Sequence, residues 1–211
     1  MKRLLMVGLS ALVLAACDNE ETTQKEPEQN TETTSEPTEE VSTDKVISET
    51  PINKTVEIKP FKVNIESISL KNRSNLTEDE ILDISTTTGE DLSNTDNFNY
   101  MDIKYKVENT VDETYIFTGI QEVAWVIDGK QEQIDIFNDE KDFILDDEEN
   151  DGGEYLGKVN KKGEVGVIIK SDPTKIKKIR MIIGHSMKEE EDGSFLGVGD
   201  EQTIELDWLF I

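Results

Sequence analysis

Closely spaced acidic side chains are the groups in this 211-residue sequence most suited to chemistry. A run that starts at Asp147 has Glu149 and Asp151 at alternate positions and ends at Gly152. Hard oxygen ligands at alternate positions, followed by a glycine that permits a sharp turn, are typical of calcium-binding loops. We therefore take Asp147, Glu149 and Asp151 as candidate metal ligands, and calcium as the ion they would bind.

The spacing does not complete an EF-hand. If Asp147 is the first position of such a loop, the twelfth is Lys158, where a bidentate glutamate is required. Two interpretations remain: a looser calcium-responsive extracellular module that uses residues 146–154, or a solvated acidic loop kept extended by its own repulsion. We favour the solvated loop and expect no resident cofactor.

Catalytic groups other than carboxylates are scarce. His185 is the single histidine, and the neighbouring Ser186 lacks the strand-turn-helix elbow that activates a serine nucleophile. One imidazole is too few for a zinc site. An envelope hydrolase with paired carboxylates is a further alternative, but nothing distinguishes one pair among 47 acidic residues. We expect that the protein is not an enzyme.

The N-terminus carries the one cysteine of the chain. Lys2 and Arg3 precede an uncharged run over residues 4–16, and Cys17 comes directly after it. This run is too short to cross a bilayer core, which needs roughly 20 helical residues, and has the pattern of a secretory signal. Leu14-Ala15-Ala16-Cys17 resembles the lipobox of bacterial lipoproteins. The resemblance implies removal of residues 1–16, lipid attachment at Cys17 and display on the outer face of the cell membrane.

The chain beyond the cysteine is strongly acidic at first and apolar residues become frequent only later. The formal net charge of -25 repels phosphate backbones, so nucleic acid is excluded as a partner. Residues 18–55 contain eleven acidic residues, three lysines and no aromatic residue. Such a segment cannot bury enough apolar surface to offset its chain entropy. We predict a lipidated, disordered tether over residues 17–55 and a folded domain over residues 56–211.

Alternation of apolar and polar residues dominates the predicted domain and indicates half-buried strands. Phe61 to Ile65 alternate, and Ile68 resumes the pattern out of phase, as a β-bulge would produce. Asp128-Gly129 separates two alternating runs and predicts a tight hairpin. The apolar sides of these strands place three aromatic residues in the core and leave Tyr100 on the exposed side; the three are Tyr105, Trp125 and Trp208.

Only one helix is predicted. Thr77 with Glu80 forms a capping box at the start of TEDEILDI, within a long polar connection. We expect one or two turns in a crossover loop, outside the core. Many short strands with a single short helix favour an all-β, antiparallel β-sandwich.

The strand succession also carries a resemblance. MDIKYKVENTVDETYIF, VAWVIDGKQ, GKVNKKGEVGVIIK and IKKIRMII resemble the immunoglobulin-like extracellular domain of unknown function of Gram-positive lipoproteins, which is similar to a mycobacterial secreted immunoprotective protein. The cysteine pair of true immunoglobulin domains is missing. The resemblance implies an immunoglobulin-like sandwich, anchored to the membrane of a Gram-positive bacterium. We expect a non-catalytic binding module for a protein or cell-envelope partner that the sequence does not identify.

Overall fold

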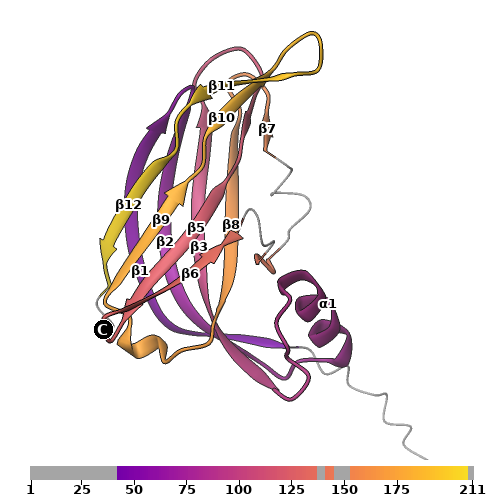
Figure 1. The fold of residues 1–211 in the computed structure, drawn as a ribbon, viewed down its shortest axis with the longest axis vertical. Coiled ribbons are helices and arrows are strands. Elements are labelled where there is room, and N and C mark those ends of the chain that lie inside the picture. Colours follow the sequence, from indigo (N-terminus) through magenta and orange to yellow (C-terminus); the bar gives the residue numbers. More distant parts are fainter. Residues whose placement is uncertain (1–41, 137–140, 145–152, 209–211) are drawn as a thin grey trace, which may run out of the picture. The chain divides into compact units, whose positions relative to one another are not determined.

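Antiparallel strands make up most of the structure. The computed structural model describes residues 42–136, 141–144 and 153–208, which lie within one compact unit, Glu39–Ile211. Its strands form three four-stranded sheets (Figure 1). Every strand pair in these ranges is antiparallel, which confirms the prediction of a mostly β, antiparallel chain.

Each sheet draws on distant parts of the chain. Sheet A has the order β1-β2-β3-β8, formed by β1 (Thr43–Ile58), β2 (Phe61–Ser74), β3 (Asn97–Asn109) and β8 (Asn160–Ile169). Sheet B has the order β11-β10-β4-β7, formed by β11 (Phe195–Gly199), β10 (Ser186–Glu189), β4 (Tyr115–Phe117) and β7 (Glu154–Tyr155). Sheet C has the order β12-β9-β5-β6, formed by β12 (Gln202–Asp207), β9 (Lys178–Ile183), β5 (Ile120–Ile127) and β6 (Lys130–Asp135).

The first strand begins earlier than the sequence predicts. The composition predicts that residues 43–55 belong to a disordered tether, but β1 starts at Thr43 and pairs with β2 along its length. Most β1 side chains before Val56 are exposed, so the backbone ladder holds the strand rather than burial of its side chains. Its register shifts twice, and Pro51 lies at one of these shifts, as proline does on an edge strand. The polar composition therefore conceals a strand.

Two predicted backbone features are confirmed. Asp128 and Gly129 have φ angles of 49° and 77°, and Ile127 pairs with Lys130 on either side of this two-residue hairpin turn. Positive φ at both turn residues matches the right-handed twist of the strands. The register of β2 against β3 shifts between Ile65 and Ser67, where the slipped alternation predicts a bulge.

The main core lies between sheet A and sheet C. Val63 and Ile103 of sheet A share one buried cluster with Trp125 and Met181 of sheet C. The three aromatic residues that we predict to be internal are all buried in this cluster; they are Tyr105, Trp125 and Trp208. Trp125 also donates its indole N–H to Glu132, 2.9 Å away, which satisfies its polar atom.

The helix differs from its prediction in length and role. The described residues contain one α-helix, α1 (Glu78–Thr88), and a short 3-10 turn, η1 (Pro173–Lys175). The predicted capping box is confirmed, because Glu80 N–H donates to the Thr77 hydroxyl oxygen and Thr77 N–H donates to the Glu80 carboxylate. However, the helix has 11 residues and joins β2 to its neighbour β3, so the predicted crossover of one or two turns is wrong.

A second apolar cluster, here the outer cluster, lies where α1 covers the outer face of sheet A. It is formed by Ile84, Leu92, Phe98, Tyr100 and Ile168. Tyr100 is therefore fully buried, although its position in the β3 alternation places it on the exposed side. The alternation identifies the two faces of β3 correctly, but it cannot show that a helix covers the second face.

Neither helix in the described part of the chain has the length and apolar character needed to cross a membrane.

Candidate functional site

The residues predicted to bind lipid and metal fall outside the described part of the chain. Cys17 precedes the first described residue, and Asp147, Glu149 and Asp151 lie within residues 145–152. The lipid site and the calcium loop therefore stay predictions. Within the described residues, no three His, Cys, Asp or Glu side chains are arranged to hold a metal ion.

His185 and Ser186 do not form a nucleophile and its base. The buried Ser186 hydroxyl donates to the backbone carbonyl of Lys59. His185 Nδ1 lies 3.4 Å from the side-chain amide nitrogen of Gln121. Each side chain thus has a structural contact, and Ser186 fastens β10 to the connection between β1 and β2.

Carboxylates converge on the outer face of sheet A. Asp102, which is 0% exposed, lies 2.5 Å from Lys71 Nζ, and Glu164 Oε1 lies 3.8 Å from the same ammonium group. Burial raises the pKa of Glu164 above its usual value, and its hydrogen bond to Asp102 raises it further. Asp102 is sealed from solvent by the packing of this face and is not open to a substrate, whereas the Glu164 side chain is 36% exposed.

A third carboxylate, Asp142, holds a short strap, residues 141–144, against β8. Asp142 Oδ1 accepts hydrogen bonds from Gly166 N–H at 2.7 Å and from Ile144 N–H at 3.0 Å. Phe143 N–H donates to the carbonyl of Gly166 at 3.2 Å. Burial of the carboxyl raises the pKa of Asp142 to about 7, although the two amide hydrogen bonds oppose the shift.

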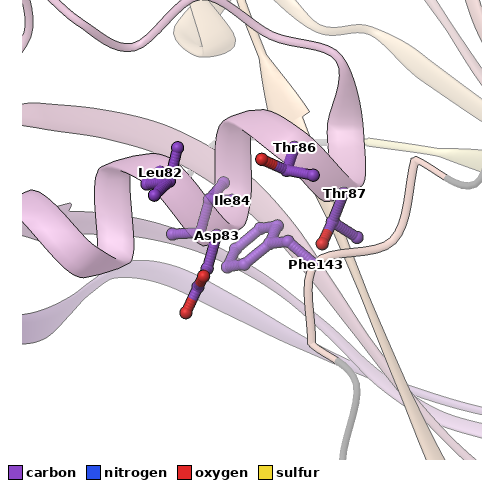
Figure 2. A pocket seen from close by; sticks show the side chains of 6 residues that line it. All are labelled: Leu82, Asp83, Ile84, Thr86, Thr87 and Phe143. Atoms are coloured by element: carbon purple, nitrogen blue, oxygen red, sulfur yellow. The ribbon is translucent and has the colours of Figure 1, made fainter.

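Phe143 of the strap and one side of α1 border an open hollow of about 540 Å³ (Figure 2). Its lining is Leu82, Asp83, Ile84, Thr86, Thr87 and Phe143. In Figure 2 the Phe143 ring lies against the helix, next to Ile84 and Thr87. With one carboxylate and two threonine hydroxyls, the lining has too few convergent polar groups to indicate a ligand class.

The most unusual surface is the hairpin β10–β11. Of the seven large apolar side chains that are exposed in the described residues, three belong to the short strand β11; they are Phe195, Leu196 and Val198. Phe195 is 57% exposed and Leu196 is 55% exposed. Single exposed apolar residues are ordinary, whereas several on one short strand make this strand a candidate site.

Local hydrogen bonds give this hairpin a defined shape. Glu190 N–H donates to Ser194 C=O at 2.9 Å, and the Asp192 carboxylate accepts from the N–H and hydroxyl groups of Ser194. Gly193 supplies the positive φ of 80° that the turn requires. On β10, Lys188 forms an ion pair with Glu113 at 2.7 Å.

β11 is also an edge strand. It ends the order of sheet B and, among the described strands, pairs with β10 alone. An edge strand presents unpaired N–H and C=O groups, which most proteins protect with charge, proline or a covering segment. Here charges lie beside the edge rather than on it, since residues 189–192 are all acidic and Asp200 and Glu201 come directly after the strand.

Known proteins give limited context for this site. No protein-family model matches the sequence, and no curated protein matches it. A crystal structure of a functionally unknown protein from Listeria monocytogenes is similar over 80% of this chain and 88% of that chain, with 6% identity and a TM-score of 0.48. An X-ray structure of a structural-genomics consortium target is similar over 71% of this chain and 88% of that chain, with 6% identity and a TM-score of 0.33.

Proposed function

We propose that this protein is an extracellular lipoprotein that displays a non-catalytic binding module on the outer face of the cell membrane. The anchor is the lipidated Cys17, and the spacer is the acidic segment that runs from it toward β1. The module binds a protein or cell-envelope partner through the hairpin β10–β11.

The sequence before the fold supports the anchor. A basic start, a short apolar run, small residues and then a cysteine together resemble the signal and lipobox of bacterial lipoproteins. Two or three acyl chains give stable membrane attachment, whereas one chain gives only marginal binding. The polar, acidic residues 18–41 then suit a spacer, because they contain too few apolar residues to form a core.

Strand order supports an immunoglobulin-like sandwich. In such domains the strands G, F, C and C′ lie side by side in that order across one sheet, and A, B and E lie in the other. Sheet C has the spatial order β12-β9-β5-β6. When its strands are lettered as they follow one another in the chain, β5 is C, β6 is C′, β9 is F and β12 is G, so the spatial order is G-F-C-C′. β2, β3 and β8 then take the places of A, B and E, with β1 as an added edge. Rigid sandwiches of this kind place function on loops and edges.

One observation carries the binding role: β11 is an apolar strand with an open edge. Burying a large apolar side chain stabilises a complex or a fold by roughly 1.5–3 kcal/mol. Phe195 and Leu196 forgo most of that gain within this chain, since more than half of each is exposed. A partner that covers them would recover it.

Membrane attachment is tested by fractionation of cells that express the full chain. Wild type should be found in the membrane fraction and be released by detergent, whereas Cys17→Ser should leave that fraction. A Cys17→Ser variant that stays in the membrane as wild type does would refute lipid anchoring.

The binding role is tested by chemical crosslinking on intact cells with two matched variants. Phe195→Ser/Leu196→Ser removes the apolar surface of β11, and Leu82→Ser/Leu156→Ser removes similarly exposed apolar groups elsewhere. The first variant should lose crosslinked partners that the second retains. Equal loss in both variants, or no loss in either, would refute a role for the hairpin.

A further inference from the structure

We infer that β11 binds an extended, basic peptide segment, which adds to sheet B as a fifth strand. This inference rests on the proposed binding role of the hairpin and specifies the partner. The juxtaposition that carries it is an open, apolar edge strand bordered by acidic residues.

The hydrogen-bond ladder shows which backbone groups are available. Glu190 N–H donates to Ser194 C=O, and the next pair along the hairpin is Glu189 with Phe195. Hydrogen-bonded and non-hydrogen-bonded pairs alternate in an antiparallel ladder. The N–H and C=O groups of Phe195 and Gly197 therefore point away from β10, toward the position that a fifth strand would take.

Both faces of the edge are apolar. Phe195 and Leu196 are consecutive residues of a strand, so their side chains lie on opposite faces of sheet B. Val198 lies at the register shift near the end of β11, in a bulge that marks where the pairing with β10 changes. An added strand would thus meet an apolar neighbour on each face, which favours a segment with apolar side chains of its own.

Charge determines which segment fits. Residues 186–201 contain six acidic side chains and one lysine, Lys188, whose charge is paired with Glu113. A second copy of this hairpin would bring the same acidic residues against these. The chain's own residues 18–41 are also acidic. Lysine and arginine residues alternating with apolar ones would instead complement the site.

The edge is already shaped for such a partner. The Ser186 hydroxyl bonds to the Lys59 carbonyl at one end of the hairpin, and the Asp192 turn closes the other. A Cβ added to Gly199 would lie 2.4 Å from the Lys59 oxygen, so the base of β11 packs closely on that connection. A preformed edge loses little conformational entropy on binding.

The test compares two substitutions at Gly197 in the purified full chain. Gly197→Pro removes an outward N–H while sparing the ladder with β10, and Gly197→Ala keeps that N–H. No heavy atom lies within 4 Å of an added Cβ at Gly197, so alanine fits. The probes are a synthetic peptide of alternating valine and lysine and its valine–glutamate counterpart.

We expect the valine–lysine peptide to bind wild type and Gly197→Ala equally, and Gly197→Pro about tenfold more weakly. Added salt should weaken this binding, and the valine–glutamate peptide should not bind. Hydrogen exchange at the Phe195 and Gly197 amides of wild type should slow when the peptide is present. This readout does not depend on the proline variant folding.

Three results would overturn the inference: no binding of the valine–lysine peptide, equal binding to a folded Gly197→Pro and to Gly197→Ala, or unchanged exchange at both amides. Equal binding of the valine–glutamate peptide would overturn the choice of a basic segment. The proposed function fails separately, because it requires only that Phe195→Ser/Leu196→Ser loses partners on cells.

Discussion

Asp142 is a residue whose ionisation opposes the fold. Its pKa is raised from 3.8 to about 7, mainly by burial. An acid with a raised folded-state pKa contributes stability that is fully present below its unfolded pKa. That contribution is lost as the pH rises through about 7. The contribution of Asp142 to folding should therefore be largest below pH 3.8 and should decline as the pH rises from there to about 7.

Asp142→Asn should remove this pH dependence. The amide oxygen can still accept hydrogen bonds from Gly166 and Ile144, but the side chain cannot ionise. From pH 5 to pH 8 we expect the free energy of unfolding of wild type to fall by roughly 3 kcal/mol relative to the variant. Denaturant titrations of both proteins measure this difference. Parallel pH profiles would show that Asp142 is not protonated in the fold.

Lys71 should matter because it neutralises a carboxylate that solvent cannot reach. Removing one partner of a buried ion pair costs about 3–5 kcal/mol, since the other charge is left uncompensated. Lys71→Met should therefore destabilise the protein by roughly 3 kcal/mol, and Lys71→Met/Asp102→Leu should regain most of that loss. Chemical denaturation of wild type and the two variants measures these differences in the free energy of unfolding. A double variant no more stable than Lys71→Met would contradict this account of Asp102.

For the individual elements, the alternation of apolar and polar residues and the residues at turns predict most of the strands, turns and caps. The Asp128-Gly129 turn, the bulge after Ile65 and the Thr77 cap were readable because each depends on neighbouring residues only. The outer cluster could not be predicted in this way, because it forms where α1 and the strap meet sheet A across long sequence separations. For the same reason Asp102 looks like a solvent-facing residue of β3, although it is buried.

Two strands escaped prediction for another physical reason. The part of β1 before Val56 and all of β11 expose most of their side chains, and neither alternates between apolar and polar residues in its sequence. Their ladders are made by backbone groups, which every sequence possesses. The clue to β11 was the apolar FLGV run between two acidic stretches, and alternation alone does not distinguish such a run from a buried strand.

The corrected start of the fold makes a prediction about proteolysis. Glutamate-specific cleavage of the native protein should occur within residues 18–41, which their composition predicts to be disordered, and should spare Glu49 and Glu57 of β1. Mass spectrometry of the early fragments identifies the cut sites. Rapid cleavage at Glu49 would show instead that the folded domain begins closer to Val56.

At the scale of the whole molecule, each region has a distinct proposed task. In our proposal the lipidated cysteine holds the protein at the membrane, the acidic segment separates the fold from the membrane, and the sheets present a hairpin. The net charge of -25 repels anionic lipid and other copies of the chain. It also raises the rate at which a basic partner would be captured.

Site-specific photo-crosslinking on intact cells tests the binding role of β11. A photoreactive phenylalanine analogue is placed at Phe195 in one strain and at Leu82, which is similarly exposed on α1, in another. We expect covalent adducts with a cell-surface partner from position 195 and none from position 82. Adducts from position 82 alone, or equal adducts from both positions, would contradict this role.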